Sequence, residues 1–240
     1  MSSPKTESDN DTLDLGETVG RTIEHVQERQ SWITYISWLM IALFLGSAVW
    51  TQSWSAVFLA ILLFVLTLIP FVFQSLANFR LPRGFVGAIV FFLIATLLLG
   101  EYYDFYERFW WWDAVLHTSS AIGFALIGMM IVVFMLRAQR IQKASPFMLS
   151  MMAFSFALSI GALWEILEFG MDQLLGMNMQ KSGLVDTMFD LIVDAIGAFI
   201  GSVGGYIYLK THKVSASNPL TKTIEDAVEN NPHIFESDAT

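Results

Sequence analysis

The sequence contains no cysteine, and only 15% of its residues are charged. The absence of cysteine excludes disulfides, thiolate metal sites and cysteine nucleophiles. Soluble domains have about 25% charged residues, so the low charge content, together with 55% hydrophobic residues, is typical of a membrane protein. Basic residues are also few, 13 against 22 acidic ones, and they form no stripe along the chain. We therefore predict the lipid bilayer as a partner and expect no nucleic-acid partner.

The N-terminal end of the chain is polar. Residues 1–31 lack the basic start, the apolar core and the small-residue cleavage site of a signal peptide, so we predict a cytoplasmic tail. By composition, residues 1–11 are expected to be disordered. The apolar residues of residues 15–30 recur roughly on one side, as in a short surface helix, but a solvated tail is the favoured interpretation.

Six apolar segments follow, each close to the roughly 20 residues that a helix needs to cross the hydrocarbon of a bilayer. Tryptophans stand at many of the segment ends, as in interfacial aromatic belts. Pro70 lies inside the second segment and should kink it. The sequence thus predicts an all-α membrane protein, a bundle of six transmembrane helices over residues 32–209. The segments are Trp32–Trp50, Trp54–Leu76, Phe85–Leu99, Trp112–Leu136, Phe147–Phe169 and Leu184–Leu209.

The last part of the chain, residues 210–240, is polar and acidic, and we predict a second cytoplasmic tail. Leu220, Ile224 and Val228 mark one face of a short helix there, but a tail is the favoured interpretation. The sequence shows no internal repeat and gives no sign of a second domain.

The distribution of charge predicts the orientation. With both termini cytoplasmic, eleven of the thirteen Lys and Arg residues lie inside, and only Arg108 and Lys181 lie outside. This asymmetry predicts a multi-pass protein of the bacterial cytoplasmic (inner) membrane with its N- and C-termini inside. Ten acids lie outside the two tails, and all ten fall in or near the outer half of the membrane. They are Glu101, Asp104, Glu107, Asp113, Glu165, Glu168, Asp172, Asp186, Asp190 and Asp194.

Three of these acids end the fifth segment. Glu165, Glu168 and Asp172 are spaced i, i+3 and i+7, so a helix projects them from one face. Carboxylates within a membrane are costly, and they usually face the protein interior or a water-filled cavity. The sequence therefore predicts a polar site near the outer end of this segment.

The fourth and sixth segments carry matching groups. Asp113 and His117 stand at i, i+4 on the fourth, and Asp190 and Asp194 stand at i, i+4 on the sixth. Because short connections make antiparallel neighbours, we expect these groups to meet those of the fifth segment at a similar depth.

Glycines on the sixth segment favour this meeting. Gly197, Gly201 and Gly205 recur at every fourth residue, a spacing that lets helix backbones approach closely. We interpret these glycines as packing residues that draw the sixth helix, with its acids, against a neighbour.

Other polar residues nearby receive structural interpretations. Asp186, beside Thr187, is expected to cap the sixth helix. Asp104 and Arg108 form a possible i, i+4 pair on the surface, and Tyr106 is expected to lie at the interface.

So many carboxylates cannot all stay ionised at that depth without compensation. One resolution is a divalent metal ion, for which Mg²⁺, Ca²⁺ or Mn²⁺ suits oxygen ligands and Zn²⁺ or Fe²⁺ becomes possible with histidine. A second is protonation, which suits proton relay or transport, and a third is structural hydrogen bonding. For the metal interpretation, Asp113 and His117 are the candidate catalytic acid–base pair. The candidate metal ligands are Glu165, Glu168, Asp190 and Asp194.

The spacing of the polar residues also carries a resemblance to known proteins. The residues concerned are Tyr106-Glu107-Arg108, Trp112-Asp113, His117, Trp164-Glu165, Glu168, Gly183, Asp186-Thr187, Asp190 and Gly197-Ala198. Their pattern resembles the YjdF-like family of bacterial inner-membrane proteins. More distantly, the order Asp-x3-His, Glu, then Asp before a Gly-x3-Gly helix is similar to VanZ-like membrane proteins, which typically have Gln or Asn where this chain has acids. The resemblance implies an integral membrane protein of bacterial type with a shared acid cluster, and it implies no particular activity.

The leading functional hypothesis is an outward-facing carboxylate–histidine site for a divalent ion that acts on a lipid-linked or envelope substrate, by hydrolysis or transfer. The sequence contains no nucleophilic serine motif, phosphate loop or HExxH motif, so the reaction is open. The alternatives are a proton- or ion-coupled transporter and an accessory membrane subunit. Residues 195–200, just inward of Asp194, contain no ionisable group, which speaks against a transport path.

Overall fold

The computed structural model describes residues 15–28, 30–137, 144–211 and 218–234. The prediction of disorder at residues 1–11 lies outside the described residues, as do several of the basic residues counted for orientation. Those are Lys5, Arg29, Arg140, Lys143 and Lys213. All regular secondary structure in the described ranges is helical, which confirms the all-α prediction.

The helices follow the predicted segments closely. In the first part of the chain they are α1 (Leu15–Gln27), α2 (Trp32–Trp50), α3 (Trp54–Thr67), α4 (Ile69–Ala77) and α5 (Arg83–Leu93). A π-helical segment, η1 (Ile94–Tyr102), and the short α6 (Phe105–Arg108) come next. The second part contains α7 (Trp112–Arg137), α8 (Pro146–Leu175), α9 (Leu184–Thr211), α10 (Pro219–Glu229) and the 3₁₀ turn η2 (Pro232–Ile234).

Among the described residues, five helical runs are long and apolar enough to cross a membrane. They are Trp32–Trp50, Trp54–Ala77, Arg83–Tyr102, Trp112–Leu136 and Pro146–Leu175. They confirm five of the six predicted segments as candidate spans. The sixth segment corresponds to α9, a helix of 28 residues that carries three aspartates, and its crossing stays a prediction.

The predicted kink of the second segment is confirmed. Helix α3 ends at Thr67, and α4 restarts at Ile69 with Pro70 in its first turn. Proline is well tolerated at this position because the first N–H groups of a helix have no partner within the helix.

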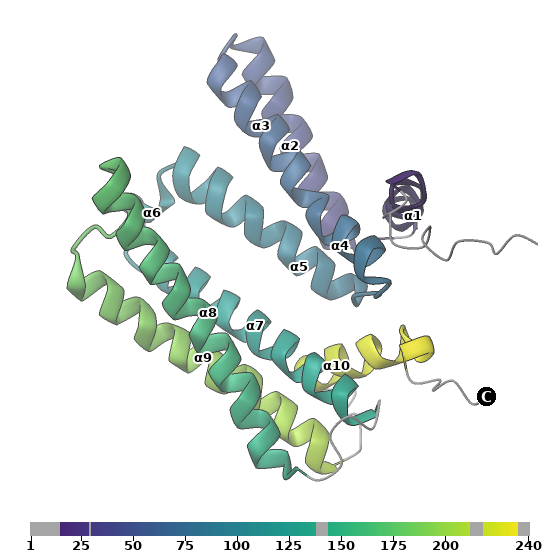
Figure 1. Ribbon diagram of the computed structural model, residues 1–240. Coiled ribbons are helices and arrows are strands. Elements are labelled where there is room, and N and C mark those ends of the chain that lie inside the picture. The colour runs from purple at the N-terminus through teal and green to yellow at the C-terminus, as the bar shows by residue number, and fades with distance from the viewer. Residues whose placement is uncertain (1–14, 29, 138–143, 212–217, 235–240) are drawn as a thin grey trace, which may run out of the picture. The chain divides into compact units, whose positions relative to one another are not determined.

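Contacts divide the chain into two compact units, the first ending at Leu93 and the second starting at Ile94. In the first unit, α2 packs against α3 and α5, and α1 lies across α4 (Figure 1). Its core includes Phe71, Val86 and Val90. Thr22 of α1 donates a hydrogen bond to Ser75 of α4 at 3.0 Å. Residues 15–27 thus form a short helix that packs on the end of the second apolar segment, and the favoured interpretation as a solvated tail is wrong for them.

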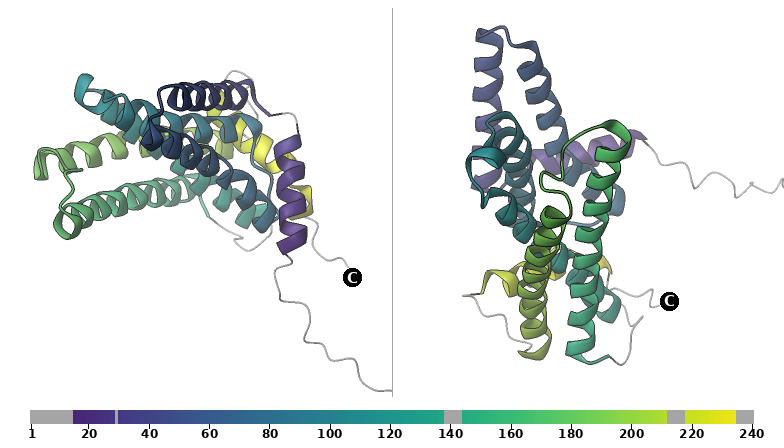
Figure 2. Two further views of the ribbon diagram at one scale, coloured as in Figure 1. Left: turned by 90° about the horizontal axis from the view of Figure 1, so that it is seen from above. Right: turned by 90° about the vertical axis from the view of Figure 1, so that its left-hand side faces the viewer.

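In the second unit, α7, α8 and α9 pack against one another (Figure 1), and α8 and α9 form an antiparallel hairpin (Figure 2). Small residues let these helices approach closely. A Cβ atom on Gly197 would overlap the carbonyl oxygen of Thr118, and one on Gly201 would lie 2.6 Å from Cβ of Ala125 on α7. The packing interpretation of the glycine stripe is confirmed, and α7 is the neighbour.

The favoured interpretation of the C-terminal end as a tail is wrong for residues 219–229. They form α10, which packs against α9 and α7. Ile224 and Val228 are buried, and Tyr208 on α9 donates a hydrogen bond to Glu225 at 2.6 Å. The apolar face of this segment is short, but burying it on an existing bundle stabilises a helix that would be marginal alone.

Candidate metal centre

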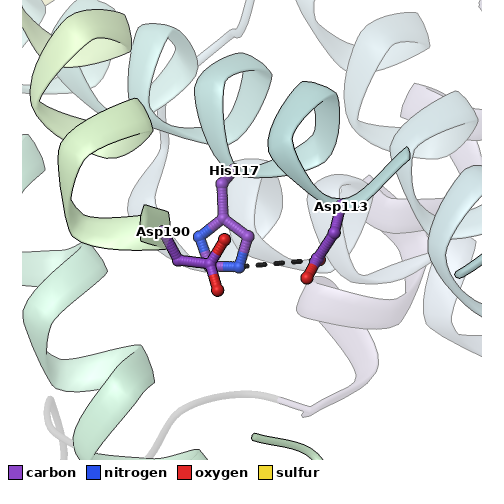
Figure 3. A group of neighbouring side chains, drawn as sticks. All are labelled: Asp113, His117 and Asp190. Carbon is purple, nitrogen blue, oxygen red and sulfur yellow. Dashed lines mark ion pairs between the residues drawn. The ribbon is translucent and has the colours of Figure 1, made fainter. Parts of the chain in front are cut away.

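The centre is built on the first two turns of α7. The indole N–H of Trp112 donates to the carbonyl oxygen of Ala95 on η1 at 3.3 Å, which anchors the start of the helix. Asp113 and His117 follow, one turn apart on the same face (Figure 3). The i, i+4 spacing read from the sequence therefore places both side chains toward one point.

The imidazole of His117 occupies the middle of the cluster and is buried. Its Nδ1 lies 3.3 Å from Oδ1 of Asp194 on α9. Its Nε2 lies 3.8 Å from Oδ1 of Asp113 and 4.0 Å from Oε1 of Glu165 on α8. All three helices of the bundle thus bring a carboxylate to this ring, as the sequence predicted.

Asp190 completes a group of three side chains that could hold a metal ion. One ligand atom each from Asp113, His117 and Asp190 lies within 4.8 Å of the other two (Figure 3). Asp190 and Asp194 are one turn apart on α9 and are 3% and 1% exposed. In Figure 3 the carboxylate of Asp190 overlaps the imidazole ring, and Asp113 lies to the right of both.

Glu165 is a buried carboxylate in this cluster that lacks hydrogen bonds within the described part of the chain. Its side chain is only 3% exposed, and among the described residues neither of its carboxylate oxygens has a hydrogen-bond partner. Thr187 and Gln180 lie beside it, but the Gln180 amide donates to the Thr187 hydroxyl at 2.6 Å. A buried carboxylate without partners is costly unless a cation or a proton compensates it.

Asp194 also has a carboxylate oxygen without a hydrogen-bond partner among the described residues, and a glycine leaves space for this side chain. Its Oδ2 is buried and has no hydrogen-bond partner in the described part of the chain. A Cβ atom built on Gly161 of α8 would overlap this carboxylate. Gly161 is a residue that sequence reasoning missed, because nothing in an apolar run marks one small residue as the wall of a polar site.

The remaining predicted acids are used differently. Glu168 accepts a hydrogen bond from the Trp164 indole at 2.8 Å and is partly exposed. Asp172 accepts the backbone N–H groups of Met179 and Gln180 at 2.7 and 2.9 Å. Asp172 therefore holds the loop between α8 and α9, although it shares a helix face with Glu165 in the sequence pattern.

The expected role of Asp186 as cap of the sixth helix needs correction. Helix α9 starts at Leu184, so Asp186 is already its third residue. Its carboxylate accepts the backbone N–H of Lys181 at 3.1 Å, in the loop before the helix. The reason is that the chain turns back through Gly183, at a φ of +64°, which brings the loop over the first turn.

Two further residues, Lys181 and Tyr106, lie beside each other in the loop before α9 and in α6. The ammonium of Lys181 lies 2.8 Å from Oε1 of Glu107 and 5.3 Å from the ring centroid of Tyr106. Burial, followed by the nearby carboxylates, Asp113 first, raises the pKa of Tyr106 well above its usual range. The phenol therefore keeps its proton and remains a hydrogen-bond donor.

These features define the class. A chain with five apolar helices of spanning length and a buried Asp–His cluster is a multi-pass α-helical membrane protein. The chain belongs to the family of predicted membrane proteins DUF2238, whose pattern matches residues 32–211.

A relative in Thermotoga maritima, described as an uncharacterized protein, is 28% identical over 130 residues. The match covers 54% of this chain and 66% of the relative, just under two thirds of its length. No solved structure matches this chain.

Proposed function

We propose that this protein binds a divalent metal ion at Asp113, His117 and Asp190 and uses it on a lipid-linked or envelope substrate. The observation that carries the proposal is the buried carboxylate of Glu165, which lies 4.0 Å from Nε2 of His117 and accepts no hydrogen bond from the described residues. A cation held at this point would compensate Glu165 together with the aspartates of α7 and α9.

The donor set fits such an ion. Two carboxylates and an imidazole are ligands for Zn²⁺, Mn²⁺ or Fe²⁺. Metal–ligand bonds of about 2.0–2.2 Å place ligand atoms about 3–3.5 Å apart. The separations of 3.8 and 4.0 Å from His117 Nε2 to Asp113 and Glu165 are therefore slightly wider than in a closed site, and small rotamer changes would close them.

The two aspartates and the two glutamates have distinct roles in this proposal. Asp190 is a direct ligand, and Asp194 orients the imidazole from its Nδ1 side. Glu165 serves as a further ligand, while Glu168 lies at the rim, bonded to Trp164. When bound, a divalent ion supplies a Lewis acid that activates water or polarises a phosphoryl oxygen.

The proposed topology has α9 as a sixth span, with both termini cytoplasmic in a bacterial inner membrane. The asymmetry of Lys and Arg supports this orientation, and the packing of α9 against two apolar candidate spans supports the sixth crossing. The centre then lies near the outer surface, and the YjdF-like resemblance is consistent with this location.

The test is the metal content of the full chain purified in detergent after incubation with Mg²⁺, Mn²⁺ and Zn²⁺. Mass spectrometry should find about one ion per chain in the wild type and none in Asp113→Asn/Asp190→Asn. The control is Asp104→Asn, since Asp104 is exposed and pairs with Arg108 at 3.8 Å outside the centre. A wild type without metal would overturn the proposal.

Proton-coupled transport is the second candidate, because the unpaired oxygens of Glu165 and Asp194 also suit protonated carboxyls. The composition of α9 speaks against it, since Ala195 to Ile200 offer no ionisable side chain. The metal measurement separates the two, because a proton relay predicts no stoichiometric ion.

A further inference from the structure

Lys181 and Tyr106 place a cation and a hydrogen-bond donor near the acidic cluster. The Lys181 ammonium lies 5.3 Å from the centre of the Tyr106 ring. Gln180, the residue before Lys181, donates a hydrogen bond from its side-chain amide to the backbone carbonyl of Glu165 at 3.5 Å. The pair therefore lies at the end of the bundle where Glu165 approaches His117.

The position of this pair is specified by its surroundings. The Tyr106 ring packs on the backbone of η1, where a Cβ atom on Gly100 would overlap the ring. The backbone N–H of Lys181 is held by Asp186 at 3.1 Å. The pair is thus placed by two different elements, the end of η1 and the loop before α9.

The ammonium of Lys181 is available for another anion. Its partner Glu107 has a side chain that is 71% exposed, and exposed ion pairs contribute little to stability. An incoming anion that also contacts the metal would compete well, because it would replace a weak contact by two stronger ones.

The same end of the second unit carries exposed apolar side chains. Trp110 before α7, Leu174 at the end of α8 and Leu184 at the start of α9 are 84%, 85% and 75% exposed. Apolar and indole side chains at this level are typical of the membrane–water interface. A ligand that reaches this end of the bundle with its acyl chains in lipid would therefore present its headgroup to Lys181 and Tyr106.

We propose that the site recognises the phosphate headgroup of an amphiphile, with the phosphate held between the metal, the Lys181 ammonium and the Tyr106 hydroxyl. This inference rests on the proposed metal centre and names its substrate class. Lysine binds phosphate as a point charge, and the phenol donates one hydrogen bond to a phosphate oxygen. The acidic wall of Asp113, Glu165 and Asp190 would repel the phosphate without the ion, so binding requires the metal.

The test uses the full chain in detergent with one equivalent of Mn²⁺. The probes are dihexanoyl phosphatidic acid, inorganic phosphate and dihexanoylglycerol. Calorimetry gives each affinity, and paramagnetic broadening of the phosphorus resonance reports a phosphate next to Mn²⁺. Asp113→Asn/Asp190→Asn supplies the background, and Arg108→Met is the control for loss of a nearby positive charge outside the site.

We expect the phosphatidic acid to bind and its resonance to broaden, with affinity reduced at least fivefold in Lys181→Met and in Tyr106→Phe and unchanged in Arg108→Met. Equal binding by the two variants and the wild type would overturn the inference, as would binding of dihexanoylglycerol as tight as that of the phosphatidic acid. If inorganic phosphate bound as tightly as the lipid, the inference that the ligand is an amphiphile would be overturned. Mn²⁺ binding without any phosphate binding would overturn this inference alone, whereas a protein that binds none of Mg²⁺, Mn²⁺ and Zn²⁺ would overturn the metal centre itself.

Discussion

Nδ1 of His117 lies 3.3 Å from Oδ1 of Asp194, which joins the start of α7 to the middle of α9. A carboxylate on one imidazole nitrogen fixes the tautomer and the ring orientation and leaves the other nitrogen free as a ligand. Nε2 consequently points to Asp113 and Glu165. This relationship makes Asp194 the residue through which the geometry of the proposed centre can be tested without removing one of its proposed ligands.

Replacing Asp194 by asparagine should weaken metal binding by about 10–100-fold, the usual effect of losing a carboxylate behind a ligating histidine. The physical reason is that an amide no longer stabilises the tautomer with its proton on Nδ1. Titration of the purified protein with Mn²⁺, followed by electron paramagnetic resonance, measures the affinity. Asp104→Asn is the control, and an Asp194→Asn protein with wild-type affinity would show that Asp194 does not orient the ligand.

Replacing Glu165 by glutamine should have opposite effects with and without metal. In the metal-free protein the change removes a buried carboxylate that accepts no hydrogen bond from the described residues, so we expect a melting temperature raised by about 2–4 °C for each kcal/mol gained. We expect the affinity for the metal to fall at least about tenfold, so that the ion stabilises the variant less than it stabilises the wild type. Melting curves in detergent, recorded with EDTA and with Mn²⁺, test both predicted changes.

Glu168→Gln is the matched control for this change, because Glu168 is on the same helix and is bonded to Trp164 at the rim. We expect it to change metal affinity by less than about threefold, as for a residue outside the ligand set. If Glu165→Gln lowered the stability of the metal-free protein and left the metal affinity unchanged, the buried carboxylate would be a structural group.

Replacing Gly161 by alanine should destabilise the protein by about 1–3 kcal/mol, because the added methyl group overlaps the carboxylate of Asp194. The displaced Asp194 should also lower metal affinity. Gly170→Ala, on the same helix with open space around the new Cβ, should instead stabilise by up to about 1 kcal/mol. Unfolding in mixed micelles measures both, and equal stability of the two variants would contradict the proposed role of Gly161.

The cysteine-free sequence allows a direct test of orientation. A single cysteine at Ser182, in the exposed loop before α9, should react with a membrane-impermeant maleimide in intact spheroplasts. A single cysteine at Glu229, exposed at the end of α10, should react only after lysis. The reverse pattern would contradict the proposed topology, and labelling of both in intact cells would contradict a sixth crossing.

Much of the architecture follows from the sequence alone. The lengths of the apolar runs predict the helices to within a few residues, because a backbone in lipid must satisfy its own hydrogen bonds. The break at Pro70 and the packing role of Gly197 and Gly201 follow from local steric rules. The gathering of acids from three segments could also be predicted, since each stands near the same end of its helix.

What only the tertiary structure decided is which partner each acid meets. Glu165, Glu168 and Asp172 share a face by spacing, yet one faces His117, one bonds Trp164 and one holds the loop backbone. The reason is that α8 continues to Leu175, more than two turns beyond the point where Glu165 approaches His117, so residues further along it meet different surroundings. The space behind Asp194 at Gly161 and the placing of Lys181 beside Tyr106 likewise depend on contacts between distant segments, which no local pattern encodes.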